Sequence, residues 1–293
     1  MLARIISGLI GIPLVVVVVF WPGGIPFVIL VALVGVLGQL EFYGSTRRRG
    51  VRPHMLLGIA IGLLMIYFGW SGWCPQSDTL LSSINLIYLI PAFTALILGA
   101  LVIEIIRTDR APVVNVGTTI LGVAYVPWLL LHFVMLRLIS GKMVVYSSKP
   151  IELGAWLVMF VLLATWALDT AAYFVGKFYG KNKMAPNLSP GKTWEGSVAG
   201  FLFAVVIGSV AGAIIRMPQP HGLILGALIG VFGQVGDLAE SALKRELGIK
   251  DFGNLIPGHG GVLDRLDSLL FTGPITFWYI VVVLSGWIAS FKA

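Results

Sequence analysis

Residues 236–268 concentrate charged and polar side chains between two apolar segments. Asp237, Glu240, Ser241, Lys244 and Arg245 follow the i, i+3, i+4, i+7, i+8 spacing, which places them on one face of a helix. Carboxylates and cations at the end of an apolar helix are costly in a membrane, so the pattern indicates a site for a charged ligand. The structural alternative is that Asp237 or Glu240 simply pairs with Lys244 on the same helix.

A glycine-rich loop, Pro-Gly-His-Gly-Gly at 257–261, follows this helix. Glycines let backbone N–H groups approach an anion, and the N-terminus of the next helix adds a favourable dipole. Asp264 and Asp267, three residues apart, are expected on one face of that next helix. Carboxylates from two helices with an anion cradle suit a divalent metal that carries a polyphosphate, and Mg²⁺ is the natural ion. The expected metal ligands are Asp237, Glu240, Asp264 and Asp267.

Two members of this segment have structural alternatives. Asp267 could act only as a first-turn partner of the helix dipole. His259 is the one histidine placed to touch the site, but a hydrogen bond within the loop would explain it equally well.

Residues 181–196 form a third polar segment, and Gly191-Lys192-Thr193 within it resembles the end of a P-loop. That motif fails, because its first glycine would fall at Pro186 and no strand is expected before it. We interpret Ser189 as the N-cap and Pro190 as the first residue of a helix. Lys192 and Thr193 would then lie in the first turn, where the dipole disfavours a cation unless an anion such as phosphate is bound.

Asp169 lies inside another apolar segment, near its inner third. It is either a functional carboxylate or a helix-packing group that is hydrogen-bonded to Tyr173. His54 and His132 are interpreted as interfacial residues, and His221 as the start of a helix on the opposite side of the membrane.

The elements that must position these groups are membrane spans. Hydrophobic residues make up 58% of the chain, charged residues only 11%, and the mean hydropathy is +0.96, which excludes an ordinary soluble domain. The sequence predicts an all-α polytopic membrane protein. Residues 1–150 carry spans one to five, and residues 151–293 carry spans six to nine with the active site on the cytoplasmic side. The nine apolar segments of about spanning length are 5–21, 25–42, 55–73, 84–106, 113–136, 153–176, 196–215, 222–243 and 269–291.

The distribution of Lys and Arg predicts the orientation. With a cytoplasmic N-terminus and an outer C-terminus, 15 of the 20 basic residues fall on the cytoplasmic side of the inner cell membrane. The net charge of +7 is therefore explained by topology and anionic lipid, and no nucleic-acid partner is expected. The arginines at 47–52 are interpreted as a topology anchor, or alternatively as a place that gathers lipid headgroups. The single cysteine, Cys74, excludes an intrachain disulfide.

The polar segments closely resemble the signature of phosphatidate cytidylyltransferases, also called CDP-diacylglycerol synthases. In this sequence the signature occupies residues 241–267 and is written Ser-x2-Lys-Arg-x4-Lys-Asp-Phe-Gly-x3-Pro-Gly-His-Gly-Gly-x2-Asp-Arg-x-Asp. Residues 189–196 and the Asp169-x3-Tyr173 pair also look like the family, so the likeness covers residues 165–268. The first half of the chain resembles the family only in its series of spans.

The resemblance implies that CTP and phosphatidate are converted to CDP-diacylglycerol and pyrophosphate, that the enzyme requires Mg²⁺ and that it is a homodimer. It also implies that Asp237 and Asp264 lie at the metal centre, and that a monovalent cation such as K⁺ binds there too. We expect catalytic roles for Asp237, Lys244, Arg245, Lys250, Asp251 and Asp264. We expect substrate binding by Asp169, Ser189, Lys192, Thr193, Glu195, Ser241, His259, Gly260, Gly261 and Arg265. A CTP-dependent polyprenol or lipid kinase would instead release CDP, and a transporter of an anionic solute would turn over no nucleotide.

Overall fold

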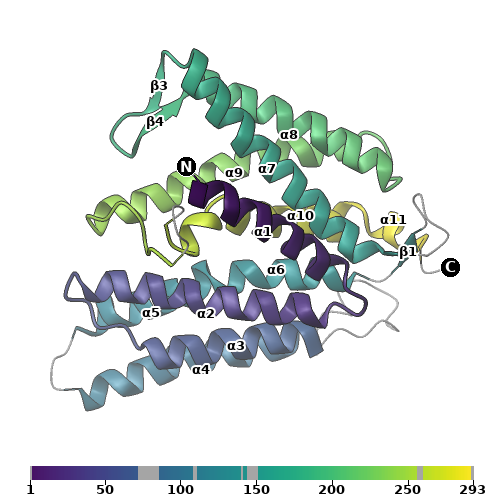
Figure 1. The fold of residues 1–293 in the computed structure, drawn as a ribbon. Helices are drawn as coiled ribbons and strands as arrows, with labels where there is room; N and C mark the ends of the chain where they lie inside the picture. The colour runs from purple at the N-terminus through teal and green to yellow at the C-terminus, as the bar shows by residue number, and fades with distance from the viewer. Residues whose placement is uncertain are drawn as a thin grey trace. The chain divides into compact units, whose positions relative to one another are not determined.

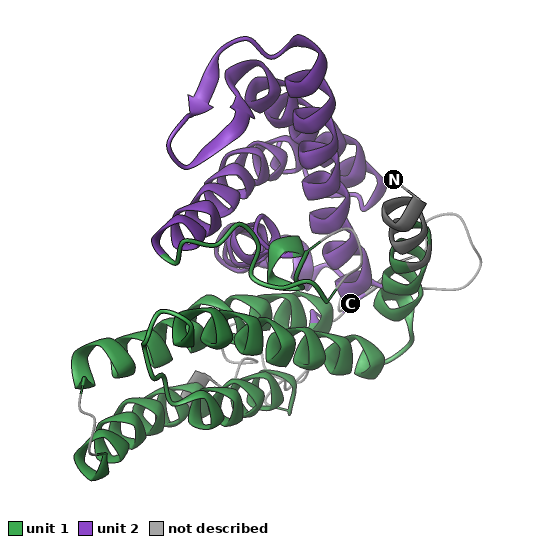
Figure 2. Cartoon of the chain, turned by 60° about the vertical axis from the view of Figure 1, so that its left-hand side comes forward, with its two compact units in different colours: residues 1–138, 247–265 green, residues 139–246, 266–293 purple. Residues whose placement is uncertain are grey.

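The structure is a computed structural model that describes residues 2–71, 86–107, 111–139, 141–143, 151–255 and 260–291. The described part is mostly helical and includes two short antiparallel sheets of two strands each (Figure 1). The chain divides into two compact units, each assembled from two stretches of the sequence (Figure 2). Unit 1 contains residues 1–138 and 247–265, and unit 2 contains residues 139–246 and 266–293. The predicted division at residue 150 separates an N-terminal region from a catalytic region by function and not by compactness, and it stays a prediction.

The described residues of unit 1 form six α-helices and one short 3₁₀ helix. Helix α3 packs against α2, α4 and α6, so it lies at the centre of the unit. A proline stands at the first or second position of α2, α5 and α6, where a missing backbone N–H costs nothing. The predicted span 113–136 is interrupted at Val126, before Pro127, and forms two helices. The elements are α1 (Leu2–Phe20), α2 (Ile25–Arg47), α3 (Met55–Ser71), α4 (Leu86–Ile106), α5 (Pro112–Tyr125), α6 (Pro127–Leu138) and η1 (Leu263–Arg265).

Unit 2 contains two short hairpins and the helices that carry most of the polar groups. Helix α8 packs against both α7 and α9, and α10 packs against α9. Glycines permit the close approach of α8 and α9, because a Cβ on Gly208 would lie 2.6 Å from the Cα of Gly226. The elements are β1 (Lys142–Met143), β2 (Ile151–Glu152), α7 (Leu153–Tyr179), β3 (Lys183–Ala185), β4 (Ser189–Thr193), α8 (Trp194–Ile214), α9 (His221–Glu246), α10 (Leu269–Val283) and α11 (Ser285–Ala289).

The helices confirm an all-α polytopic membrane protein. Six segments within the described residues are long and apolar enough to cross a membrane, namely α2, Tyr88–Ile106 of α4, α5 together with α6, α7, α8 and α9. Three further apolar helices are shorter: Gly11–Phe20, α3 and α10. The predicted last span, 269–291, is divided at Leu284 into α10 and α11. The count of nine spans and their orientation stay predictions.

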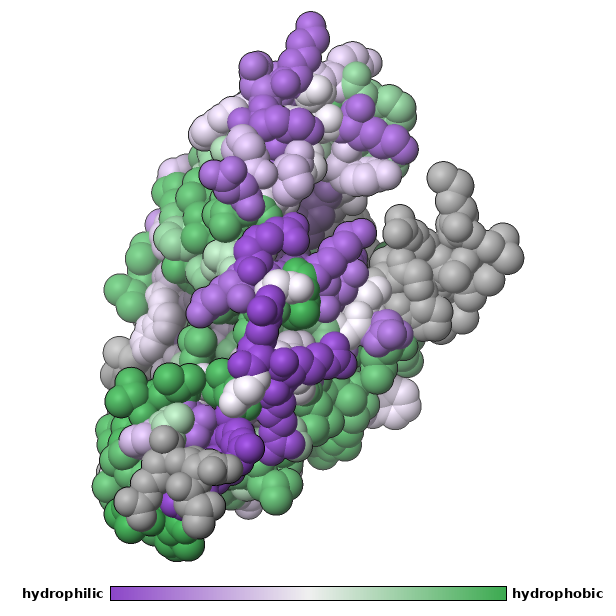
Figure 3. Space-filling model, turned by 90° about the vertical axis from the view of Figure 1, so that its left-hand side faces the viewer, coloured by the Kyte–Doolittle hydropathy of each residue, from purple (hydrophilic) through white to green (hydrophobic). Residues whose placement is uncertain are grey.

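Polar side chains collect at one end of the unit 1 helices. Arg47, Arg48, Arg49 and Arg52 are exposed around the turn between α2 and α3. On the face shown in Figure 3, hydrophilic side chains gather and hydrophobic side chains border them. This distribution is typical of helix ends that emerge from the hydrocarbon layer.

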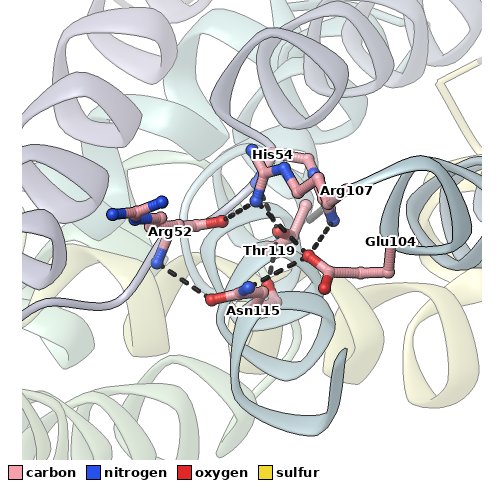
Figure 4. A network of polar contacts seen from close by, with 6 residues as sticks. All are labelled: Arg52, His54, Glu104, Arg107, Asn115 and Thr119. Atoms are coloured by element: carbon pink, nitrogen blue, oxygen red, sulfur yellow. Dashed lines mark hydrogen bonds and ion pairs between the residues drawn. The ribbon is translucent and has the colours of Figure 1, made fainter. Parts of the chain in front are cut away.

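A buried polar network joins the same helix ends in unit 1 (Figure 4). Glu104 Oε1 accepts hydrogen bonds from Asn115 Nδ2 (3.0 Å) and Arg107 Nη1 (3.3 Å), and it lies 3.1 Å from His54 Nε2. The His54 backbone N–H donates to Thr119 Oγ1 at 2.8 Å. We call these five residues the Glu104 network.

His54 and His132 are 4% and 3% exposed, so both are buried within the protein, and their interfacial placement stays a prediction. His54 lies in the Glu104 network, and its burial lowers its pKa below the usual value, with the charge of Arg107 acting in the same direction. His132 Nδ1 lies 3.0 Å from the Trp128 carbonyl oxygen. His221 begins α9 as expected, and its Nδ1 lies 2.8 Å from the Tyr279 hydroxyl.

Candidate active site

The polar end of α9 approaches the start of α10 within unit 2. A Cβ on Gly236 would lie 2.5 Å from the backbone oxygen of Asp267, so only glycine allows this approach without a shift. The next residue in α9 is Asp237, which is partly exposed. The local packing therefore brings the Asp237 and Asp267 segments together.

Asp169 of α7 belongs to the same group of charges. Its Oδ1 accepts a hydrogen bond from Ser268 Oγ at 3.3 Å, so its polar partner is Ser268 rather than the expected Tyr173. The charges of Asp237, Asp267 and Lys192 all act on Asp169. We call Asp169, Asp237 and Asp267 the carboxylate cluster. Counted formally, with every carboxylate ionised, the cluster and the Lys192 ammonium sum to a charge of minus two.

Lys192 forms an ion pair with Asp237. Its Nζ lies 2.7 Å from Asp237 Oδ2, and the two side chains are 22% and 33% exposed. The Nζ atom itself is buried. Partial burial makes such a pair stronger than one on an open surface, because water screens it less.

The predicted helix start at Ser189 was wrong. Ser189 begins β4, which pairs with β3 through Lys183 opposite Thr193 and Ala185 opposite Ser189. The N-cap of α8 is Thr193, whose side chain accepts a hydrogen bond from the Gly196 backbone N–H at 3.2 Å. Lys192 therefore lies in a strand, and the argument from the helix dipole does not apply to it.

Glu195 has a structural partner at the base of the same hairpin. Its Oε1 accepts a 2.7 Å hydrogen bond from Asn182 Nδ2, and its carboxylate also accepts from the Asn182 backbone N–H. These bonds tie the residue before β3 to the first turn of α8. They give the hairpin that carries Lys192 a fixed attachment.

Further along α9, Glu240 and Lys244 form an ion pair. Lys244 Nζ lies 2.9 Å from Glu240 Oε1, and Glu240 is fully buried. The pairing alternative is thus correct for Glu240, whereas Asp237 pairs with Lys192. Arg245 Nε donates to the Leu188 carbonyl oxygen at 3.0 Å and so links the end of α9 to the hairpin turn. Ser241 is buried on the same helix.

The signature loop that follows α9 belongs to unit 1, and Asp264 organises it. Asp264 Oδ2 accepts hydrogen bonds from the backbone N–H groups of Phe252 and Gly261, each at 2.9 Å. Asp264 is 4% exposed and lies in η1. The expectation that Asp264 and Asp267 share a helix face was wrong, because α10 begins only at Leu269.

Glu41 of α2 is a loop contact that the sequence analysis missed. Its two carboxylate oxygens accept from the backbone N–H groups of Val262 (3.0 Å) and Leu263 (2.8 Å). The available signal was an acidic residue inside the predicted span 25–42.

Some of the remaining signature residues lie within the described part of the structure and others do not. Lys250, Asp251 and Arg265 are exposed, and Gly260 has a φ of +86°, a conformation that favours glycine. His259, with Pro257 and Gly258, lies outside the described residues.

Oxygen ligands for a divalent cation are present, but they are not gathered into a preformed cage. Among the described residues, no group of three or more His, Cys, Asp or Glu side chains is placed to hold a metal ion together. The carboxylate cluster has the donor chemistry that Mg²⁺ prefers, and Mg²⁺ commonly takes its other ligands from water and phosphate. Asp267 Oδ1 also accepts from the Ser268 backbone N–H at 2.7 Å. The alternative role of Asp267 in the first turn of the helix does not hold, because α10 begins two residues later at Leu269.

Comparison with known proteins extends the likeness over the whole chain. A model of the cytidylyltransferase family matches residues 2–283. The phosphatidate cytidylyltransferase of Synechocystis sp. is 32% identical, with 96% of this chain and 97% of that protein aligned. The phosphatidate cytidylyltransferase of Bacillus subtilis is 31% identical over 95% and 97%, and that of Brucella suis is 31% identical over 76% and 83%. The similarity therefore includes both units and not the signature alone.

Proposed function

This chain belongs to the cytidylyltransferase family, and from that premise we propose how its residues carry out the reaction. The chain is a multi-pass membrane enzyme that transfers the cytidylyl group of CTP to phosphatidate and forms CDP-diacylglycerol and pyrophosphate. The acyl chains of phosphatidate belong to the bilayer, so the nucleotide has to meet the lipid headgroup at a membrane surface.

We infer that the carboxylate cluster and Lys192 form the part of the site that handles the metal and the phosphates. The observation that carries this inference is the Lys192–Asp237 ion pair of 2.7 Å close to two further carboxylates, Asp169 and Asp267. Neighbouring carboxylates favour a divalent cation, and Asp237, Asp267 and Asp169 would supply the oxygen ligands. When bound, Mg²⁺ would neutralise charge on the triphosphate during transfer.

The Lys192–Asp237 pair supports a role for both residues in the substrate-free enzyme. Each side chain holds the other in place by an ion pair of 2.7 Å, so neither charge is isolated at the membrane edge. Lys192 suits a phosphate as its alternative partner, because an ammonium is a compact donor of three hydrogen bonds. Thr193 and the Asn182–Glu195 bonds keep the hairpin and Lys192 attached to α8.

The reaction does not call for a strong general base. Phosphatidate already carries an anionic phosphate oxygen, which forms the new bond to the α-phosphorus of CTP while the bond to the bridging oxygen of the leaving pyrophosphate breaks. Positioning and charge neutralisation therefore supply the catalysis. Lys244 and Arg245 are proposed to offset the charge of the pyrophosphate. Glu240 orients Lys244, and the Leu188 carbonyl oxygen holds Arg245.

We propose that the signature loop in unit 1 binds the nucleotide. Asp264 is proposed as a further metal ligand, as the resemblance implies, and it also fixes the loop through two backbone N–H groups. Gly260, Gly261 and Arg265 would contact phosphate oxygens, with Lys250 and Asp251 beside them. Glu41 is a positioning residue, because it holds the Val262 and Leu263 backbone.

The finer features of the assembly are also proposals. We propose nine spans in the inner cell membrane with a cytoplasmic N-terminus, a homodimer, and K⁺ as a second cation. The 15-to-5 division of basic residues supports the orientation. In a Cys74→Ser background, Lys183→Cys and Glu246→Cys should resist membrane-impermeant thiol reagents in intact cells. Ready labelling of both positions would indicate the opposite orientation.

One assay tests the reaction and its assignment to these residues. The purified chain in detergent is given phosphatidate, Mg²⁺ and CTP that is labelled at the α-phosphate. We expect label in the lipid and one pyrophosphate released for each lipid labelled. Release of CDP without lipid label would indicate a kinase, and no turnover of CTP would contradict the enzyme.

A further inference from the structure

An apolar groove with a cavity volume of about 600 Å³ lies between α7 and α8 of unit 2. Its lining is almost entirely hydrocarbon and aromatic. Thr170 is the one lining residue with a hydroxyl group, and the larger side chains are Leu163, Trp166, Phe174, Phe203 and Ile214. No member of the carboxylate cluster lines the groove, so its chemistry is separate from the transfer reaction.

The groove has the length of one membrane leaflet. Its lining on α7 runs from Leu163 to Val175, which corresponds to about 18 Å at a rise of 1.5 Å per residue. Half of the hydrocarbon core of a bilayer is about 15 Å thick. One lipid acyl chain that lies along the helices would therefore fill the groove.

A cation lies at the end of the groove nearest the C-terminus of α7. Phe174, which lines the groove, stacks on Phe178 with ring centroids 6.4 Å apart. Lys177 Nζ lies 5.8 Å from the Phe178 ring centroid and 5.6 Å from that of Tyr173. The exposed Lys181 and Lys183 follow directly in the chain. Apolar lining that ends in exposed cations matches a lipid with an anionic headgroup.

We propose that the α7–α8 groove binds one acyl chain of a resident anionic phospholipid whose headgroup lies at Lys177. We assign this lipid apart from the substrate, because neither Lys192 nor any member of the carboxylate cluster lines the groove. A helix of a second copy is a poorer occupant. Helix interfaces in membranes depend on small residues that let backbones approach, whereas Phe174 and Phe203 stand 52% and 55% exposed at this groove.

Lipid retention by the full chain tests the proposal. The protein is purified in detergent, delipidated, and mixed with equal amounts of phosphatidylglycerol and phosphatidylcholine, and the bound lipids are counted by native mass spectrometry. We expect phosphatidylglycerol to be retained in preference. Lys177→Gln should reduce that preference about fivefold, the contribution of one cation near a lipid surface. Ala167→Phe should fill the groove and reduce retention of both lipids.

The control is Val198→Phe, which places the same phenylalanine side chain at an exposed position of α8 outside the groove lining. It should retain lipid as the unmodified chain does. Equal retention of the two lipids by the unmodified chain would overturn the proposal. A dimer that Ala167→Phe dissociates while lipid retention is unchanged would also overturn it, because a second copy would then cover the groove.

Discussion

Each unit contains a cluster of charged groups, and the two clusters differ in what surrounds the carboxylates. In the Glu104 network of unit 1, one carboxylate is matched by the Arg107 guanidinium, the Asn115 amide and the nearby His54 ring. In unit 2, the carboxylate cluster brings three carboxylates together, and the Lys192 ammonium pairs with Asp237. The comparison teaches that a single charged residue on an apolar helix can serve packing, and that several like charges brought together are the stronger sign of a site for a charged ligand.

Removal of a cluster carboxylate should have the largest effect on the reaction. Asp237→Asn keeps the volume of the side chain but removes a proposed metal ligand and the partner of Lys192. We expect the rate of CDP-diacylglycerol formation to fall about a hundredfold or more, as for other losses of transition-state charge stabilisation. Initial rates in the labelled-CTP assay measure it. A rate within threefold of normal, with normal dependence on Mg²⁺, would contradict the assignment.

The same type of change in the Glu104 network should affect stability instead. Glu104→Ala removes the acceptor of the buried Asn115 amide and the carboxylate that pairs with Arg107, which we expect to cost about 3 kcal/mol of the free energy of unfolding. Thermal unfolding in detergent should show a lower midpoint than for Glu246→Ala, which removes an exposed carboxylate at the end of α9. An unchanged midpoint together with a lost Mg²⁺ requirement would reverse the roles of the two clusters.

Lys192 should have a smaller effect than Asp237. Lys192→Met removes one charge-assisted contact worth about 1.5–3 kcal/mol, so we expect at least a tenfold loss in kcat/KM for CTP or phosphatidate. Lys192→Arg should recover only part of the loss, because a planar fork does not replace a point charge in a narrow site. Unchanged kinetics for the Met variant, with normal expression, would remove Lys192 from the site.

The approach of α9 to Asp267 can be disturbed without changing any charge. A methyl group at Gly236 would meet the Asp267 backbone oxygen, so Gly236→Ala should shift the carboxylates and lower kcat severalfold. The matched control is Gly117→Ala in α5, where a Cβ meets nothing within 4 Å. Equal activity of the two variants would show that this approach does not position the site.

The smallest expected effect concerns pH. The folded pKa of His54 is lowered by burial, so the folded protein binds fewer protons there than the unfolded chain. The stability contribution of His54 is therefore complete above the unfolded pKa near 6.5 and is lost as the pH falls below it. His54→Gln should flatten the fall in thermal midpoint between about pH 7 and pH 5. An equally steep fall in the variant would assign the pH dependence to another group.

The sequence was informative wherever the pattern was local and helical. The face of α9 that carries Asp237, Glu240 and Lys244 follows from spacing alone, and the structure shows the Glu240–Lys244 pair that this spacing allows. Helix periodicity did not predict the hairpin at Ser189, because strand pairing with residues 183–185 decides that conformation. Nor did it predict the conformation at Asp264, which lies in the 3₁₀ turn η1 and not in α10.

Contacts between residues far apart in the chain could not be predicted from spacing. Glu41 contacts a loop 221 residues later, and Lys192 of β4 pairs with a carboxylate on α9. His54 contacts Glu104 and Thr119, which come from two later helices. Each of these contacts depends on tertiary packing, and residues that meet through tertiary packing have no regular spacing in the sequence.

The central claim is that the carboxylate cluster binds a divalent cation, and binding of Mn²⁺ tests it most directly. Mn²⁺ replaces Mg²⁺ at carboxylate sites and can be counted as bound or free by electron paramagnetic resonance. The purified chain is titrated with Mn²⁺ in the presence of CTP, with Asp237→Asn and Glu104→Gln alongside. We predict that the unmodified chain and Glu104→Gln bind Mn²⁺ alike, whereas Asp237→Asn binds at least tenfold more weakly. Equal binding by all three proteins would contradict the account.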